Sequence, residues 1–305
     1  MLVESFIKYI RYELNRSAHT VLSYRGDITQ FIEYCTNGVN EEFKPELVTS
    51  ADVRGWMVQL SKSGVGSRSI RRKVQSLRAL YRYLIKQGMV VEDPTMDIEM
   101  AKVKRVLPSY VKPDVMDVVL GVVFDKSDFE SVRDNLMLLM LYTTGMRRAE
   151  LISLLDKDVD TTVKELKVMG KRSKSRIIPF GDELSDAISQ YREVKDMVIG
   201  GDTERFFTRI SGEPLYPSLV YNVVHSKLAA VDAASKMSPH VLRHSFASSL
   251  LNNGAELNSV KELLGHQSLV ATQVYTHVTF SELKENYKQA HPRATKKGGY
   301  YGSKD

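Results

Sequence analysis

Residues 143–151 read Thr-Thr-Gly-Met-Arg-Arg-Ala-Glu-Leu and join two helices that the sequence predicts. The first is an apolar helix from about Ser127 to Thr143, and the second is a short helix that carries Arg147 to Leu154. Two strands are expected next, Glu165–Met169 and Arg176–Phe180, on either side of a turn. Further helices are expected near residues 182–196, 217–230, 238–252, 256–264, 268–275 and 281–290. The second half of the chain is therefore predicted to be mainly helical, with one small hairpin.

The first hundred residues are expected to form helices joined by short turns. Ser17 can cap one helix, and Thr49 or Ser50 can cap another, because a side-chain hydroxyl accepts a hydrogen bond from a free backbone N–H group. The proline-containing stretch that ends at Pro113 has no helical period, which is typical of a linker. A chain of 305 residues is long for one core, so two domains are predicted.

One helix of this first half, predicted between Gly66 and Gly88, has two different faces. An apolar stripe is formed by Ile70, Val74, Leu77, Tyr81 and Leu84. A basic face at helical spacing is formed by Arg68, Arg71, Arg78, Arg82 and Lys86. From Lys62 to Lys86 the chain has eight Lys or Arg and no acid, whereas a merely solvated helix more often mixes Glu with Lys and Arg. We therefore predict that the basic face lies against DNA phosphates.

Composition sets broader limits. The net charge of +6 hints at a polyanionic partner. Apolar stretches are too short to span a bilayer, and the N-terminus shows no cleavable signal pattern, so we expect a cytoplasmic protein without membrane contact. Cys35, the single cysteine, falls on an apolar helix face and is expected to be a buried packing residue in a reducing compartment.

Five short motifs follow one another in the second half. After residues 143–151 come Gly-Lys-Arg-Ser-Lys-Ser-Arg (170–176), His-Val-Leu-Arg-His (240–244), Leu-Gly-His (264–266) and Thr-Gln-Val-Tyr-Thr-His-Val (272–278). Each motif alone is a weak signal, but together and in this order they closely resemble the signature of the tyrosine recombinase (integrase) family. The resemblance covers almost the whole chain, and it is greatest to the Xer recombinases of bacterial chromosome dimer resolution.

The resemblance implies a mainly α fold in which two domains close as a clamp on duplex DNA. Residues 1–98 would be a helical N-terminal core-binding domain and 99–113 a linker. Residues 114–292 would form a mainly helical catalytic domain with a small antiparallel β-sheet, followed by a flexible tail at 293–305. The implied partners are duplex DNA with a specific recombination site, three further protomers of itself or of a related recombinase, and a septal DNA translocase. Helix 281–290 is the candidate for a segment passed to a neighbouring protomer.

The reaction expected of such an enzyme gathers negative charge on the nonbridging oxygens of a phosphodiester. Arginine suits this charge because its planar fork binds two phosphate oxygens and stays protonated. Arg147 and Arg243 are our candidates. The resemblance places the catalytic arginine at the first Arg after Gly-Met, which favours Arg147 over Arg148. Glu150 matches an acid that supports this arginine rather than reacting.

The resemblance also assigns Lys171, in the predicted turn, the role of general acid toward the leaving 5′ oxygen. Many relatives have a second glycine after this lysine, where this chain has Arg172, so Lys174 remains an alternative. Lys174 and Arg176 are in addition expected to contact DNA.

Histidines at 240 and 244 have a spacing that zinc proteases also use. Such a helix would carry Glu at position 241, where this chain has Val, and Arg243 would place a cation beside the metal. We therefore predict no metal site and treat His244 as structural. The resemblance implies that His240 and Arg243 bind the scissile phosphate, with His240 assisting proton transfer. His266 would hydrogen-bond the same phosphate.

Tyr275 is one of fifteen tyrosines, and only the resemblance singles it out. Its attack on phosphorus would leave a 3′-phosphotyrosyl bond and a free 5′ hydroxyl. Because that ester conserves the energy of the broken linkage, rejoining needs no ATP, and the chain has no Gly-rich phosphate-binding loop. We therefore expect no cofactor.

Three alternatives remain open. A mobile-element integrase of the same family often carries an additional N-terminal arm-binding domain, whereas here the first helix is expected almost directly after Met1. A type IB topoisomerase uses similar phosphotyrosine chemistry but would relax supercoils as a monomer. A DNA-binding protein that has lost the chemistry would lack an arginine or the tyrosine of the set, and this chain has them all.

Overall fold

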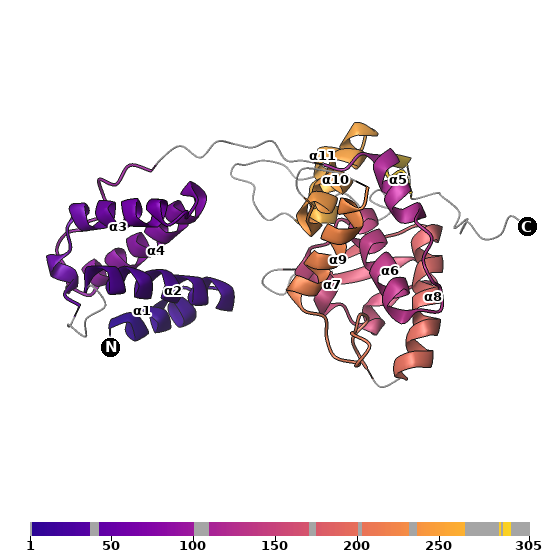
Figure 1. Ribbon diagram of the computed structural model, residues 1–305, viewed down its shortest axis with the longest axis horizontal. Coiled ribbons are helices and arrows are strands. Elements are labelled where there is room, and N and C mark those ends of the chain that lie inside the picture. Colours follow the sequence, from indigo (N-terminus) through magenta and orange to yellow (C-terminus); the bar gives the residue numbers. More distant parts are fainter. Residues whose placement is uncertain are drawn as a thin grey trace, which may run out of the picture. The chain divides into compact units, whose positions relative to one another are not determined.

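The computed structural model of the chain forms two compact units, Met1–Val106 and Leu107–Asp305. It describes residues 2–36, 43–100, 110–170, 175–200, 203–231, 237–265, 287 and 289–293. Both units are mainly helical, and the second contains a small antiparallel sheet (Figure 1), so the predicted fold class is confirmed. The division between the units lies within the 99–113 stretch that the sequence assigns to a linker. None of the described helices is both long and apolar enough to cross a bilayer.

The first unit is built from short helices with defined caps. Its elements are α1 (Leu2–Lys8), the π-helical turn η1 (Tyr9–Glu13), α2 (Ala18–Cys35), the 3₁₀ turn η2 (Pro45–Leu47), α3 (Ser50–Lys62) and α4 (Ser67–Lys86). Ser17 caps α2, because its Oγ accepts a hydrogen bond from the Thr20 N–H at 3.3 Å. Thr49, not Ser50, caps α3, and Asp52 returns a bond by accepting from the Thr49 N–H at 2.8 Å. Both caps satisfy N–H groups that have no partner within the helix.

The apolar stripe of α4 forms much of the core of this unit, as predicted. Val74, Leu77 and Leu84 have no exposed surface, and α4 packs against α2 and α3. Burying each such side chain contributes about 1.5–3 kcal/mol to folding. Cys35 is only half-buried, rather than buried as expected, and that burial raises the pKa of its thiol to about 11.

A buried carboxylate ties α4 to α2. The side chain of Asp27 on α2 is 3% exposed and accepts hydrogen bonds from Arg72, from Lys73 Nζ at 3.1 Å and from Ser76 Oγ at 2.7 Å. A buried charge needs such partners because it has lost its hydration. Arg72 and Lys73 therefore belong to the packing of the unit, although they lie in the acid-free basic stretch.

The second unit is centred on α6 (Phe129–Thr144), which packs against α5, α7, α8, α9 and α10. The other elements are α5 (Pro113–Gly121), α7 (Arg148–Ser153), the 3₁₀ turn η3 (Asp156–Asp158), β1 (Val159–Asp160), β2 (Glu165–Met169), β3 (Ser175–Pro179), α8 (Asp182–Ile199), α9 (Pro217–Ala229), α10 (Pro239–Asn252) and α11 (Leu257–Leu264). Helix α5 and strand β1 were not predicted. Pro113 marked the end of a linker in the sequence, yet proline is also favoured in the first turn of a helix, and it starts α5 here. The predicted helix at 268–275 lies outside the described residues.

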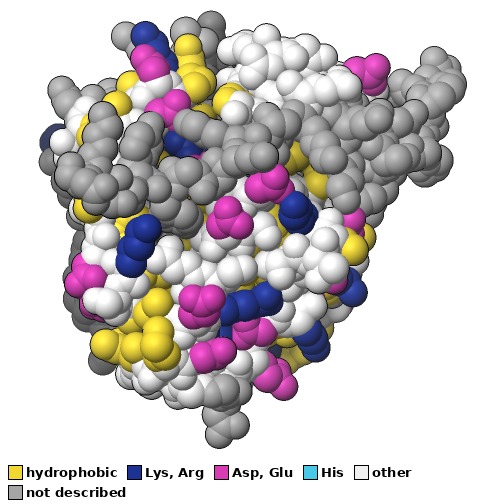
Figure 2. Space-filling model, turned by 90° about the vertical axis from the view of Figure 1, so that its right-hand side faces the viewer, with side chains coloured by type: hydrophobic (Ala, Val, Ile, Leu, Met, Phe, Trp, Pro, Cys, Tyr) yellow, Lys and Arg dark blue, Asp and Glu magenta, His cyan; other side chains and the backbone are white. Residues whose placement is uncertain are grey.

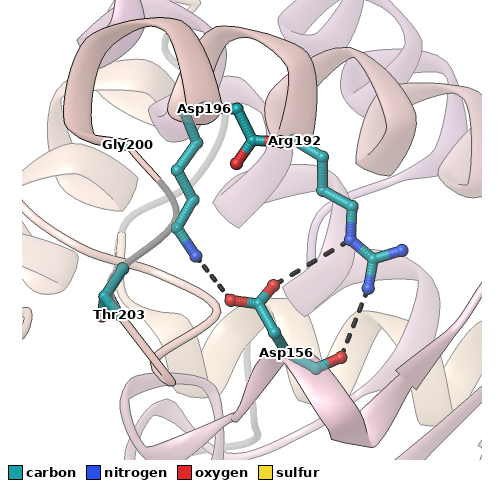
Figure 3. A pocket seen from close by; sticks show the side chains of 6 residues that line it. Asp156, Arg192, Asp196, Gly200 and Thr203 are labelled. Carbon is teal, nitrogen blue, oxygen red and sulfur yellow. Dashed lines mark hydrogen bonds and ion pairs between the residues drawn. The ribbon is translucent and has the colours of Figure 1, made fainter.

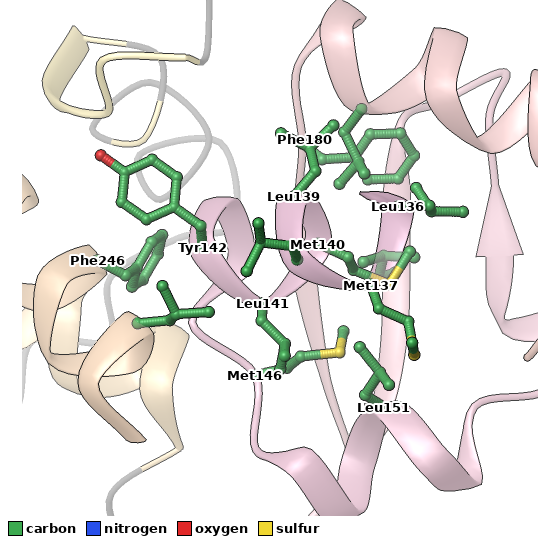
Figure 4. Close-up of a cluster of buried hydrophobic side chains, with 14 of the residues drawn as sticks. Leu136, Met137, Leu139, Met140, Leu141, Tyr142, Met146, Leu151, Phe180 and Phe246 are labelled. Atoms are coloured by element: carbon green, nitrogen blue, oxygen red, sulfur yellow. The ribbon is translucent and has the colours of Figure 1, made fainter. Parts of the chain in front are cut away.

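Helix α6 ends at a glycine that no other residue could replace without strain. Gly145 adopts the left-handed conformation with φ of 60°, and its N–H donates to the Leu141 carbonyl at 3.2 Å. A Cβ atom at this position would lie 2.9 Å from Cγ of Phe246 on α10. Figure 4 shows the Phe246 ring beside Tyr142, at the end of the buried cluster that α6 supplies. The turn from α6 into α7 is thereby fixed against α10.

The sheet has the order β1-β2-β3, and both strand pairs are antiparallel. In the β2–β3 pair, Val168 lies opposite Arg176 and Leu166 opposite Ile178. Side chains alternate between the two faces of a strand, so Arg176 shares a face with the buried Ile178, whereas Ile177 points outward and is 43% exposed.

The last described residues pack on the second unit itself. The ring of Tyr287 is buried 5.3 Å from that of His291, and Asn253 Nδ2 donates to the Ala290 carbonyl at 2.7 Å. Arg293 forms ion pairs with Asp117 on α5, at 2.6 Å, and with Glu183 on α8. Two residues of the 281–290 segment that was expected to pass to a neighbouring protomer, Tyr287 and Ala290, therefore contact their own chain in this structure.

Candidate active site

Arg147 lies immediately before α7, where Glu150 holds both its backbone and its side chain. The Arg147 N–H donates to Glu150 Oε2 at 2.7 Å, and Nη1 donates to Oε1 at 2.7 Å. Nη2 donates to the carbonyl of Gly265 at 3.1 Å. The Arg147 side chain remains 36% exposed, so the rest of its guanidinium is open to a ligand.

Arg243 reaches the same place from α10. It is 8% exposed, with Nη1 donating to the Gly145 carbonyl at 2.6 Å and Nη2 to the Leu264 carbonyl at 2.6 Å. Burial, followed by repulsion from Arg147, lowers the pKa of Arg243 to about 10, which leaves it protonated at neutral pH. Because Leu264 and Gly265 are consecutive, the structure brings the two predicted arginines together.

His240 lies one helical turn before Arg243 on α10 and therefore shares a face with it. Its side chain is exposed. Burial of part of the ring, and then the charges of Arg148 and other neighbouring cations, lower the pKa of His240 below its ordinary value of 6.5. The imidazole is therefore neutral at pH 7 and can accept a proton. Arg148 itself donates to the Pro217 carbonyl at 3.1 Å.

Glu150 is almost fully buried, with 4% of its side chain exposed, and forms ion pairs with two arginines. Arg176 donates to both of its carboxylate oxygens, Nη1 to Oε1 and Nη2 to Oε2, each at 2.9 Å. Burial by itself raises the pKa of Glu150, but the hydrogen bonds and charges of Arg176 and Arg147 outweigh it and lower the pKa. Glu150 is thus an ionised support for Arg147, as the resemblance implies.

The position of Arg176 differs from the expected DNA contact. Its side chain is 11% exposed, and besides binding Glu150 it donates through Nε to the Leu263 carbonyl at 2.6 Å. All three nitrogens of the guanidinium are engaged inside the protein, so this arginine belongs to the interior of the site. The sequence does hold a signal for this orientation. Arg176 lies two residues before the apolar Ile178, and residues two apart on a strand point to the same face.

Four predicted site residues lie outside the described part of the chain: Lys171, Lys174, His266 and Tyr275. Residues that adjoin three of them, Lys171, Lys174 and His266, are described. Strands β2 and β3 end and begin on either side of residues 171–174. Gly265 ends α11 in the left-handed conformation with φ of 63°, as predicted, directly before His266.

Of the basic face on α4, four members are exposed: Arg68, Arg71, Arg82 and Lys86. Arg78 differs, because it is half-buried and donates to the carbonyls of Thr95 at 3.3 Å and Ile98 at 3.0 Å. It therefore anchors the segment that follows α4. Figure 2 shows one face of the molecule on which acidic and basic side chains lie side by side.

A cavity of about 320 Å³ near the end of α8 contains none of these candidates. Its cations are already paired: Lys195 Nζ lies 2.6 Å from Asp156 Oδ2. Arg192 Nη2 donates to the Asp156 carbonyl at 3.3 Å, and its Nε lies 3.9 Å from Asp156 Oδ1 (Figure 3). Within the described ranges, no group of three His, Cys, Asp or Glu side chains could hold a metal ion.

Two tyrosines of the second unit are poor candidates for a nucleophile. Tyr142 and Tyr287 are each 1% exposed. Burial raises the pKa of the Tyr142 phenol to about 12, and it raises that of Tyr287 further. A phenol that resists deprotonation and has no access to solvent cannot attack a bound phosphate.

Comparison with known proteins identifies both units. Residues 116–282 match the phage integrase family, and residues 3–88 match the N-terminal SAM-like domain of phage integrases. Tyrosine recombinase XerC of Chlorobaculum parvum is 36% identical over 96% of this chain and 94% of its own length. Tyrosine recombinase XerC of Listeria welshimeri is 34% identical over 96% of this chain and 98% of its own length.

Solved structures share the fold at lower identity. The XerH site-specific recombinase in its post-cleavage complex with palindromic difH substrate has a TM-score of 0.70 at 20% identity, covering 94% of this chain and 83% of that one. The Tn1549 transposon integrase in complex with transposon right-end DNA has a TM-score of 0.67 at 19% identity, covering 94% and 98%.

Proposed function

This chain belongs to the phage integrase family and is a site-specific tyrosine recombinase, and we propose that Arg147 and Arg243 hold the scissile phosphate that Tyr275 attacks. The observation that carries the proposal is the convergence of the two guanidinium groups. Arg147, at the N-cap of α7, and Arg243, on α10, reach the adjacent carbonyls of Gly265 and Leu264. Each arginine is fixed along one edge, and a guanidinium has five N–H donors. The remaining donors are thus preorganised for the nonbridging oxygens of a phosphate.

In the proposed reaction the Tyr275 phenol attacks phosphorus, and the bond to the 5′ oxygen breaks. His240, neutral at pH 7, is placed to take up a proton, and Lys171 supplies one to the leaving oxygen. His266 hydrogen-bonds the phosphate. The products are a 3′-phosphotyrosyl ester and a 5′ hydroxyl, so attack by a 5′ hydroxyl of the partner strand reverses the chemistry without ATP.

DNA binding is assigned to the exposed part of the basic face on α4, which is Arg68, Arg71, Arg82 and Lys86. Each phosphate that they neutralise releases counterions and so strengthens binding. We further propose that the two units close as a clamp on a specific duplex site. Four protomers, of this chain or with a related recombinase, then exchange one strand pair after the other through a Holliday junction.

As the physiological role we propose chromosome dimer resolution in the cytoplasm, on the resemblance of the motifs to Xer recombinases and in keeping with relatives named tyrosine recombinase XerC. A septal DNA translocase is the partner expected of such a role. A second candidate is a mobile-element integrase that acts by the same chemistry, since the family that residues 116–282 match is that of phage integrases. An assay that offers the enzyme both reactions separates the two candidates. Exchange between two chromosomal sites favours dimer resolution, and integration of a circular element favours a mobile-element integrase.

Cleavage of nicked suicide DNA in a single turnover tests the arginine assignment. Arg147→Ala and Arg243→Ala should each slow cleavage by about 10²–10³-fold, as expected for loss of one preorganised donor to a developing oxyanion. Arg148→Ala is the matched control, because Arg148 adjoins Arg147 but donates to the Pro217 carbonyl, and it should cleave at the wild-type rate at pH 8. If the Arg148 variant is the defective one, the assignment is wrong. Plasmid relaxation in place of two-site exchange would favour a topoisomerase.

A further inference from the structure

Three arginines converge on the C-terminal end of α11. Arg176 Nε donates to the carbonyl of Leu263 at 2.6 Å, Arg243 Nη2 to that of Leu264 at 2.6 Å, and Arg147 Nη2 to that of Gly265 at 3.1 Å. The last carbonyls of a helix have no partner within it and carry the negative end of its dipole. Three successive carbonyls therefore act as fixed acceptors for three cations.

Two of these arginines are also joined through Glu150. The Arg147 side chain binds one oxygen of this carboxylate at 2.7 Å and its backbone N–H binds the other at 2.7 Å, while the Arg176 side chain binds both oxygens at 2.9 Å. The carboxylate is too deeply buried for water to replace a lost partner, so its orientation depends on the arginines. The Arg147 guanidinium binds Glu150 through Nη1 alone, whereas the guanidinium of Arg176 makes two parallel hydrogen bonds that fix the carboxylate in the plane of its fork.

We propose that Arg176 is a positioning residue for the recombination reaction, which aligns Arg147 through Glu150 and through the end of α11. The inference rests on the proposed phosphate-binding role of Arg147. Arg176 is 11% exposed, and all three of its guanidinium nitrogens donate to protein atoms, so it acts without touching the phosphate. Arg176 also lies in β3, the strand that begins directly after residues 171–174, and its hydrogen bonds to Glu150 and Leu263 join this strand to α7 and α11.

The chemical consequence concerns the free edge of Arg147. Without Arg176, the buried carboxylate keeps only the backbone N–H and Nη1 of Arg147 as partners, and β3 loses its hydrogen bond to the Leu263 carbonyl. The Arg147 guanidinium is then expected to shift together with the carboxylate. A displacement of about 1 Å at a catalytic group costs about 10²-fold in rate. DNA affinity is set by phosphate contacts spread over the interface, so it should change little.

The test compares Arg176→Met with Arg192→Met in the full-length protein. Arg192 is a suitable control because its guanidinium likewise donates to backbone carbonyls of the second unit, those of Asp156 and Val159, but belongs to the cavity near α8. DNA binding is measured by mobility shift, and covalent cleavage of nicked suicide DNA is measured in a single turnover. We expect Arg176→Met to bind DNA normally and cleave about 10²-fold more slowly, with Arg192→Met unchanged in both.

Two further readouts separate positioning from a general structural role. In an Arg147→Ala background, Arg176→Met should cause no additional loss, because residues that act as a unit are non-additive. A substrate with a methylphosphonate at the scissile position carries less charge, so the Arg176→Met defect should shrink on it. Arg176→Lys retains the charge but not the two-point contact, and it replaces Arg176→Met in every arm if the latter does not fold.

Weaker DNA binding with a normal rate for the bound complex would overturn the inference in favour of a DNA contact. Additive losses with Arg147→Ala, or a defect of equal size on the methylphosphonate, would overturn it in favour of a different role. These results are distinguishable from failure of the proposed function, in which wild-type and Arg147→Ala proteins cleave alike.

Discussion

Gly145→Ala should perturb the site through a steric clash that can be measured directly. A non-glycine residue in the left-handed region costs about 1–2 kcal/mol. The new methyl would also press on the Phe246 ring, 2.9 Å from Cγ and 3.0 Å from Cε1, and overpacking a core costs about 1–3 kcal/mol. We therefore expect a loss of about 2–5 kcal/mol in the free energy of unfolding.

The matched control is Gly254→Ala in the same unit. Gly254 has φ of 87°, but a Cβ atom there would meet no heavy atom within 4 Å. Only the backbone cost of about 1–2 kcal/mol should appear. Urea unfolding of the full-length variants measures both values, and a double-mutant cycle with Phe246→Leu isolates the clash, with an expected coupling energy of about 1–3 kcal/mol.

The same clash should also lower the rate of DNA cleavage. The Gly145 carbonyl accepts a hydrogen bond from Arg243 Nη1 at 2.6 Å, so a shift of this turn moves a phosphate-binding arginine. Gly145→Ala should therefore also slow single-turnover cleavage, whereas Gly254→Ala should not. Equal destabilisation by the two substitutions, or an additive cycle with Phe246→Leu, would refute the reasoning.

Further substitutions test the charged network. Asp27→Ala leaves the cations on α4 without their buried partner and should cost about 1–3 kcal/mol in urea unfolding; an unchanged midpoint contradicts this. Arg71→Ala should leave stability unchanged but reduce the salt dependence of DNA binding, measured as log Kd against log salt, by about one unit of slope. Arg148→Ala removes a cation that lowers the pKa of His240, so the acid limb of the cleavage–pH profile should move to higher pH. Burial lowers the pKa of His291 to about 3, whereas the same imidazole in the unfolded chain has a pKa near 6.5. The free energy of unfolding should therefore stay constant above about pH 6.5 and fall below that pH by up to about 1.4 kcal/mol per pH unit. His291→Phe should remove that slope in urea titrations at several pH values, and an unchanged slope would assign it to other groups.

The helices could be predicted from sequence because their signals are local. The period of apolar residues in α4 depends only on residues within the helix, as do the caps at Ser17 and Thr49. Helix α5 was missed because the same proline that breaks a helix interior also favours a helix start. Strand β1 has only two residues and is too short to show an alternation.

The contacts of the site residues could be predicted from the sequence only in part. The arginines Arg147 and Arg243 could be chosen from their chemistry and from the order of the motifs. Arg78 and Arg176 were expected on DNA because a basic residue in a basic run gives no sign of the carbonyl it contacts. Those acceptors, at Ile98 and Leu263, come from other segments, and only the folded chain brings them together. Contacts of this kind between distant residues are set by packing rather than by propensity.

The central claim is that Tyr275 forms the covalent bond to DNA beside the two arginines. Wild-type and Tyr275→Phe proteins should be incubated with labelled, nicked suicide DNA that carries the recombination site, and the products separated on a denaturing gel. A covalent protein–DNA species with the wild type alone, traced by peptide mapping to Tyr275, is the predicted result. An adduct that persists in Tyr275→Phe would assign the attack to another tyrosine and contradict the account.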